Sequence, residues 1–219
     1  MFVPHVDGNI GKYMMHMPEE ISQASGLRIF GKLTKSFVFT TDIAMIRNIN
    51  ADAVISVYPF TPQPVIAHAI ITASNLPVFC GVGGGSVSGA GIVEVAKDAE
   101  FSGAAGIVVN APTSNDTIRL LKENLDIPIL LTVTSTKSDI DERVAAGVDI
   151  FNVSAAAETP AVVRYIRDRY PEFPIIATGG PSADTILQTI SAGANGITYT
   201  PPSTADVFRD MMNKYRQLF

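Results

Sequence analysis

The feature that most constrains the fold is a regular alternation of short apolar runs with helical segments. The eight runs are Phe37–Thr41, Ala53–Tyr58, Pro77–Gly81, Gly106–Asn110, Pro128–Val133, Asp149–Val153, Pro174–Thr178 and Gly196–Thr200. They are mostly continuous apolar stretches without a period of two, which is typical of parallel strands that are buried on both faces. Eight such strands predict an α/β fold of the (βα)8 TIM-barrel type.

The segments between the runs have the spacing of amphipathic helices. The segment Thr117–Leu125 is an example of such an amphipathic helix. Its apolar residues Ile118, Leu121 and Leu125 recur at intervals of three and four, while charged residues fill the other positions. The segment Ala161–Tyr170 has the same pattern. We therefore expect a helix after each strand, as in a chain of βαβ units.

A weak internal repeat supports this count of strands. The third, fifth and seventh runs begin with Pro77, Pro128 and Pro174. Proline is tolerated there because the first position of a strand needs no hydrogen-bond donor. The other runs after the first are introduced by the similar segments 51–54, 104–107, 147–150 and 194–197. The repeating unit thus comprises two strands with their helices.

The length of the chain and the alternation of its strands and helices suggest one domain over residues 1–219, a size that suits a small barrel. Residues 1–36 form an extension before the first strand. Within it we expect a helix in Met14–Arg28 that closes the bottom of the barrel or contacts another subunit. The alternative fold is an open doubly wound sheet. Such a sheet normally has a glycine-rich turn after its first strand, and Phe37–Asp42 contains none.

Composition excludes several classes of function. The net charge of −5 is opposite in sign to a nucleic-acid-binding surface, so we expect no nucleic-acid partner. No run of about 18 apolar residues occurs, so we expect no membrane span. Three scattered histidines do not have metal-ligand spacing, and we expect neither a metal nor a cofactor. One cysteine, Cys80, and no signal pattern suggest a cytoplasmic protein.

The low charge of the chain is relevant to its assembly. Charged residues make up 17% of the sequence, whereas about 25% is typical of soluble domains. Either part of the surface is covered by another subunit, or the barrel is simply rich in buried strands. We expect a homo-oligomer.

The ligand site of such a barrel lies at the carboxyl ends of its strands. The residues at these ends are mostly neutral, with many hydroxyl and amide side chains. The candidates for catalysis are Asp42 as a general base and Asn110 and Asn152 as groups that orient the ligand. The alternative for Asp42 is to cap a helix over Ile43–Ile49.

The most specific motif follows the seventh strand. There Thr178, Gly179 and Gly180 precede Ser182 and the start of a helix. Glycines let backbone N–H groups approach an anion, and the amino end of the helix attracts it. We predict that these residues, together with Thr200 of the eighth strand, bind a phosphate or carboxylate of a small anionic ligand. The alternative is a tight turn in which Ser182 caps the helix.

A second glycine cluster follows the third strand and contains Gly83, Gly84 and Gly85. It predicts either a loop that surrounds a ligand or a flexible loop without that role. It is not a P-loop, because no Lys-Ser or Lys-Thr pair follows at the required spacing.

The stretch 143–200 resembles the ribulose-phosphate-binding barrels, and among them most the 2-keto-3-deoxy-6-phosphogluconate aldolases. The similar segments are Ala146–Asn152, Tyr170–Pro171, Pro174–Gly180 and Ala192–Ala194. The resemblance implies a phosphate-binding, aldolase-like barrel. Those aldolases carry a Schiff-base lysine on the sixth strand, where this chain has Asn152, which cannot form an imine.

The resemblance also implies glycines at the end of the eighth strand that complete a phosphate site. This chain has Pro201 and Pro202 after that strand, and prolines donate no N–H. The hydroxyls of Thr200, Ser203 or Thr204 are possible substitutes.

Three functions follow as hypotheses. The first is an enzyme, a lyase or isomerase, acting on a small phosphorylated or carboxylated metabolite. The second is a regulatory barrel that senses a sugar phosphate. It is implied by a similarity in general layout to glycerol-3-phosphate-responsive antiterminators and is favoured by the missing lysine. The third is a hydrolase, because the whole chain resembles a group of bacterial barrels loosely labelled hydrolases. Metal-dependent hydrolysis is disfavoured because the sequence lacks a His/Asp cluster.

Overall fold

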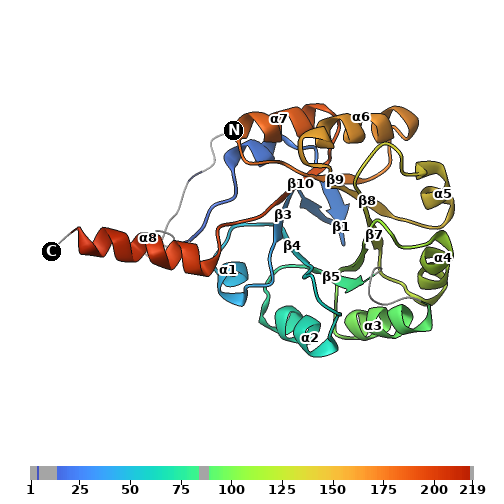
Figure 1. The fold of residues 1–219 in the computed structure, drawn as a ribbon, viewed down its shortest axis with the longest axis horizontal. Helices are drawn as coiled ribbons and strands as arrows, with labels where there is room; N and C mark the ends of the chain where they lie inside the picture. The colour runs from blue at the N-terminus through green and yellow to red at the C-terminus, as the bar shows by residue number, and fades with distance from the viewer. Residues whose placement is uncertain (1–3, 5–13, 84–88, 218–219) are drawn as a thin grey trace.

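A computed structural model describes residues 4, 14–83 and 89–217. Eight parallel strands close into a barrel in the order β10-β3-β4-β5-β6-β7-β8-β9 (Figure 1). Their bounds are β3 Ser36–Phe39, β4 Ala53–Ser56, β5 Val78–Gly83, β6 Gly106–Val109, β7 Ile129–Val133, β8 Ile150–Val153, β9 Ile175–Thr178 and β10 Gly196–Tyr199. Each predicted run overlaps one of these strands. The predicted (βα)8 barrel is therefore confirmed.

Helices alternate with the strands of the barrel. Their bounds are α1 Ile43–Arg47, α2 Pro64–Ala73, α3 Ala90–Phe101, α4 Asn115–Asn124, α5 Ile140–Ala145, α6 Thr159–Arg169, α7 Ala183–Ser191 and α8 Thr204–Arg216, with a 3-10 turn η3 at Ala156–Glu158. The helices α1 to α7 surround the barrel, whereas α8 extends away from it (Figure 1). In the part of the chain that the structure describes, no helix is long and apolar enough to cross a membrane.

The projecting helix α8 carries its apolar side chains in solvent. None of its residues is buried, and the exposed large side chains are Val207, Phe208, Met211 and Tyr215. The predicted homo-oligomer stays a prediction.

The inside of the barrel is filled by side chains. Phe37 and Phe79 are fully buried there, and their rings meet edge to face with centroids 6.0 Å apart. Two glycines make room for them. A Cβ atom on Gly106 would lie 2.7 Å from the ring of Phe79, and one on Gly196 would lie 2.8 Å from the ring of Phe37. The small residues that introduce alternate strands thus have a packing role in the core.

A β-hairpin closes the amino end of the barrel. It consists of β1 (Leu27–Ile29) and β2 (Lys32–Thr34), which pair antiparallel. Leu27 and Ile29 lie on one face because side chains alternate along a strand, and both are buried in the inner core cluster. The prediction of a helix in Met14–Arg28 is therefore wrong in its element, since only a short 3-10 helix, η2 (Glu19–Gln23), forms there. The bottom of the barrel is closed, as predicted, but by the hairpin and not by a helix.

The repeat that precedes alternate strands has a structural explanation. Asp52, Asp149 and Asn195 each stand just before a strand, and each accepts a hydrogen bond from the first backbone N–H of a neighbouring strand. The donors are Ser36 at 3.1 Å, Ile129 at 2.9 Å and Ile175 at 3.0 Å. These side chains provide hydrogen-bond acceptors for backbone N–H groups at the strand starts. The strand starts form the amino face of the barrel, which serves stability in this fold.

Candidate functional site

A group of neutral polar side chains lies inside the carboxyl end of the barrel. Asn152 of β8 and Thr198 of β10 are only 6% and 5% exposed. The parallel register places Thr132 beside Asn152 and Thr178 beside Thr198. Because side chains alternate along a strand, Asn152 points to the same side of the sheet as Ile150, which belongs to the inner core.

Among the residues that the structure describes, the amide of Asn152 has only weak partners. Its Nδ2 lies 3.5 Å from Oγ1 of Thr132, and its Oδ1 lies 3.5 Å from Oγ1 of Thr198. These distances are longer than those of ordinary protein hydrogen bonds. A buried amide can make several hydrogen bonds, and weakly satisfied polar groups at strand ends are typical of ligand sites. Asn152 and Thr178 were among the predicted site residues. Thr132 and Thr198 belong to the hydroxyl side chains that the sequence predicted at the strand ends without a role of their own, and the strand register brings them beside the other two.

The turn between β9 and α7 contains the predicted anion-binding glycines. Gly180 has a φ of +78°, a conformation that favours glycine. A Cβ on Gly179 would lie 2.7 Å from Ile197 and 2.8 Å from Ile186, so this glycine lets the helix approach the barrel closely. Ser182 forms a capping box with Thr185. The alternative role of this motif, a tight capped turn, is thus confirmed, and its binding of an anion stays a prediction.

The surroundings of this turn both favour and oppose an anion. A cavity of about 320 Å³ lies beside it and is lined in part by Thr178, Gly179 and Gly180. The amino end of α7 attracts negative charge, whereas Asp184 in its first turn repels it. The predicted residue Thr200 is exposed at the end of β10.

Two of the hydroxyls that could replace the glycines of the phosphate site after β10 already form hydrogen bonds within the protein. Ser203 donates its hydroxyl hydrogen bond to Asp206 at 2.5 Å, and Thr204 donates to Oδ2 of Asp42. Of the three candidate hydroxyls, these two therefore already serve carboxylates within the protein.

Asp42 is the N-cap of α1, as its alternative role predicted. Its Oδ1 accepts a hydrogen bond from the N–H of Met45 at 3.1 Å. Burial by itself would raise the pKa of Asp42, but hydrogen bonds from Thr204 and from backbone N–H groups outweigh it and hold the pKa below 3.8. The lowered pKa makes this carboxylate a weaker base than an ordinary aspartate. Its predicted role as general base stays untested, and the geometry favours the cap.

The cap at Asp42 leads to a stability prediction. We expect Asp42→Ala to lower the free energy of unfolding by about 1 kcal/mol at pH 7, because α1 loses its N-cap. The pKa of Asp42 is lower in the folded than in the unfolded chain, so this contribution is complete above the ordinary pKa and lost as the pH falls through the folded value. Urea unfolding of both proteins from pH 7 down to about 3 measures it.

The control for this prediction is Asp42→Asn, since asparagine also caps helices well. It should retain most of the stability at pH 7. A difference between wild type and Asp42→Ala that does not shrink in acid would contradict the assignment.

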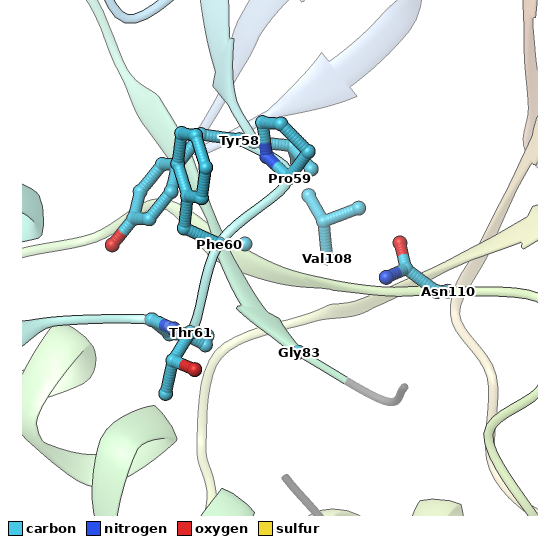
Figure 2. Close-up of a pocket in the computed structure, with 10 residues that line it drawn as sticks. Tyr58, Pro59, Phe60, Thr61, Gly83, Val108 and Asn110 are labelled. Atoms are coloured by element: carbon cyan, nitrogen blue, oxygen red, sulfur yellow. The ribbon is translucent and has the colours of Figure 1, made fainter. Parts of the chain in front are cut away.

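A cavity of about 470 Å³ opens at the carboxyl ends of β4, β5 and β6. It is lined by Val57, Tyr58, Pro59, Phe60, Thr61, Pro62, Gly81, Gly83, Val108 and Asn110. Figure 2 shows the aromatic side chains of the β4–α2 loop on one side and the amide of Asn110 on the other. The predicted residues Asn110 and Gly83 thus share one cavity, while Gly84 and Gly85 lie outside the described residues.

The sequence prediction placed Tyr58 at the end of the second strand without giving it a role, and it missed Phe60. The segment Tyr58-Pro59-Phe60-Thr61-Pro62 directly follows a strand. Two aromatic residues between prolines at a strand end would have been a usable signal, because loops at that end carry the ligand contacts of a barrel.

The cavity results from an irregularity in β5. The register between β5 and β6 shifts between Gly81 and Gly83, which is typical of a β-bulge, a feature common next to active sites. Gly83 has a φ of +103°. A Cβ on Gly81 would lie 3.0 Å from Cγ2 of Val57. The backbone conformation at position 83 therefore favours glycine, and a side chain at position 81 would require Val57 to move.

Arg143 of α5 holds the loop after β6 that carries Asn110. Its guanidinium donates to the carbonyl oxygens of Ala111 and Thr113 and to Oδ1 of Asn115. The backbone N–H of Asn110 also donates to the carbonyl of Gly83 at 3.3 Å. These contacts fix the position of Asn110 relative to β5.

Other reactive groups are less suited to chemistry at this end. Burial raises the pKa of the Cys80 thiol to about 12, so it is not a thiolate at neutral pH. Across residues 14–83 and 89–217, no group of three or more His, Cys, Asp or Glu side chains could hold a metal ion.

Comparisons with known proteins identify the fold. No family model and no curated protein matches the sequence. Among solved structures, phosphoenolpyruvate phosphomutase from Streptomyces platensis subsp. rosaceus is similar with a TM-score of 0.64 and 12% identity, over 86% of this chain and 82% of that one. 2,3-Dimethylmalate lyase, a PEP mutase/isocitrate lyase superfamily member, has a TM-score of 0.64 and 14% identity, over 91% and 84%.

A third similar structure is a glycerol uptake operon antiterminator-related protein from Thermotoga maritima MSB8. Its TM-score is 0.59 at 20% identity, over 76% of this chain and 95% of that one. At such identities the likeness shows the barrel fold alone. The resemblance to the aldolases in particular stays a prediction, and Asn152 does lie on the sixth strand of the barrel, β8.

Proposed function

We propose that this protein is an enzyme that binds a small phosphorylated or carboxylated molecule at the carboxyl end of its barrel and carries out lyase- or isomerase-like chemistry on it. The observation that supports this most is the amide of Asn152. It is buried at the barrel centre, and its hydroxyl partners lie at 3.5 Å. A buried polar group with such weak partners destabilises the unliganded protein. A ligand oxygen that accepts from Nδ2 would satisfy it.

Two further observations support an anionic ligand. The amino end of α7 and the turn at Gly180 lie at the same end of the barrel as Asn152, and helix amino ends attract phosphates and carboxylates. Two of the similar structures are a phosphoenolpyruvate phosphomutase and a 2,3-dimethylmalate lyase, whose names denote small phosphorylated and carboxylated molecules.

The second candidate function is a regulatory barrel that binds such a molecule without converting it. It is favoured by the chemistry of the central side chains, because asparagine and threonine bind ligands well but do not exchange protons near neutral pH. The low pKa of Asp42 points the same way. The similarity to an antiterminator-related protein adds to this candidate.

Calorimetric titration with oxalate, inorganic phosphate, phosphoenolpyruvate and glycerol 3-phosphate tests the shared part of both functions. At least one of these anions should bind the wild-type protein. Asn152→Leu should bind it about 5- to 12-fold more weakly, because the hydrogen bond from Nδ2, of about 1–1.5 kcal/mol, is lost. Leucine has a similar volume, so the variant should remain folded.

The control is Asn75→Leu, an exposed position before β5 at the opposite end of the barrel, which should bind as the wild type does. Absence of binding to every anion, or equal affinity of Asn152→Leu, would contradict the site. Proton and phosphorus NMR of phosphoenolpyruvate or glycerol 3-phosphate, followed over hours with the protein, separates the two functions. New product signals indicate the enzyme, and an unchanged spectrum indicates the regulator.

A further inference from the structure

The cavity at the ends of β4, β5 and β6 differs in chemistry from an anion site. Valine, tyrosine, phenylalanine, threonine, proline, glycine and asparagine make up its described lining, and none of them carries a charge. A phosphate or carboxylate placed there would meet no cationic side chain in the described lining. The volume of about 470 Å³ is within the range of small-molecule pockets. The cavity is therefore suited to an uncharged part of a ligand.

One wall of the cavity presents an aromatic ring to solvent. Phe60 is 74% exposed, although it lines the cavity. Its loop is stiffened by Pro59 and Pro62, which fix their own φ angles. The hydroxyl of Tyr58 also accepts a hydrogen bond from the N–H of Gln63 at 2.8 Å. A preorganised aromatic ring loses little entropy when a flat ligand stacks on it.

The opposite wall presents an amide (Figure 2). The side chain of Asn110 is exposed and makes no hydrogen bond among the described residues, while its backbone is fixed by Gly83 and by the loop that Arg143 holds. Between the two walls the side chains of β5 are replaced by Gly81 and Gly83. The open space thus has a stacking surface on one side and a paired donor and acceptor on the other. Asparagine binds the edges of nitrogen heterocycles in this way.

We propose that this cavity binds an uncharged planar nitrogen heterocycle of the nucleobase type, which stacks on Phe60 and pairs its edge with Asn110. The inference rests on the proposed function in one respect: the heterocycle is the uncharged end of a ligand whose anionic group lies nearer Asn152 and α7. The substrate class is then a ring-bearing phosphate or carboxylate.

Ligand-observed NMR and calorimetry on the full chain test the inference. The probes are adenine, uracil and nicotinamide as free heterocycles, adenosine and uridine monophosphate as ring-bearing phosphates, and ribose as a non-planar ring. We expect at least one heterocycle to bind with saturation transfer to its ring protons, and ribose not to bind. The matching ring-bearing phosphate should bind more tightly than the free ring, because it reaches both subsites.

The variant Phe60→Leu should weaken heterocycle binding about 5- to 150-fold, the usual effect of losing one aromatic stacking partner. Its position is exposed, so the variant should fold as the wild type does. Asn110→Leu should weaken the same binding. The matched control is Phe101→Leu, the same substitution at an 89% exposed residue at the end of α3, which should bind as the wild type does.

The outcomes separate this inference from the proposed function. If no heterocycle binds, if only ribose binds, or if Phe60→Leu binds as tightly as the wild type, the inference is overturned, and oxalate or phosphate binding can still uphold the proposed function. If a heterocycle binds in a Phe60-dependent way while every anion fails, the inference stands and the anion site fails. In Phe60→Leu, binding of oxalate or phosphate should be unchanged.

Discussion

Replacing Phe79 by alanine should lower the free energy of unfolding by about 3–5 kcal/mol, a large fraction of the stability of an ordinary domain. Phe79 is fully buried inside the barrel, against Phe37 and the backbone at Gly106. Hydrogen-bonded strands surround the ring, so the barrel cannot collapse onto the cavity that the substitution leaves. Urea unfolding followed by circular dichroism measures the loss.

The control for this prediction is the exposed phenylalanine of α3. Phe101→Ala removes the same atoms from a side chain that is 89% exposed, and it should change the free energy of unfolding by about 0.5 kcal/mol or less. Equal losses in the two variants would show that Phe79 is not packed as described.

Replacing Arg167 by methionine should destabilise the protein by about 3 kcal/mol or more. Its guanidinium donates to the carbonyl oxygens of Pro171, Phe173 and Gly193 and to Oδ1 of Asn195, at 2.7–2.9 Å. It thereby connects the turn before β9 to the turn before β10. Burial lowers the pKa of Arg167. Its hydrogen bonds to Phe173, Gly193 and Asn195 are partly buried, so its removal would leave these oxygens partly shielded from water without a donor.

Two variants sharpen this second prediction. Arg164→Met removes an exposed arginine with one hydrogen bond, to the carbonyl of Ser191, and should change the free energy of unfolding by less than about 1 kcal/mol. Arg167→Lys should restore only part of the stability, because one ammonium cannot reach both turns as a planar guanidinium does. Full rescue by lysine would contradict the geometry.

The eight barrel strands could be predicted because each is buried on both faces and therefore reads as a continuous apolar run. The hairpin β1–β2 could not be predicted in the same way. Its strands are three residues long, and only Leu27 and Ile29 carry the alternation that identifies a strand. A helix with a few apolar residues gives the same local signal.

The candidate site divides in a similar way. Asn152 and Thr178 could be predicted because they lie near the carboxyl ends of their strands. In this fold that end of the barrel carries the ligand site, whereas the amino end serves stability. Thr132 and Thr198 lie near strand ends as well, but their places beside Asn152 and Thr178 depend on the register between strands, which a single sequence does not encode locally. The cavity at Phe60 depends on a bulge at Gly81 and Gly83 and on a loop conformation. Neither has a periodic signature.

The polar side chains at the amino face, Asp52, Asp149, Asn195 and Arg167, also bear on how readily this protein can acquire new activities. They bind strand starts and turns far from the carboxyl ends, so substitutions in the loops around Asn110 and Phe60 leave these hydrogen bonds intact. A directed-evolution library confined to those loops should therefore retain a high proportion of folded members. A library of the same size spread over the amino-face turns should lose most of them.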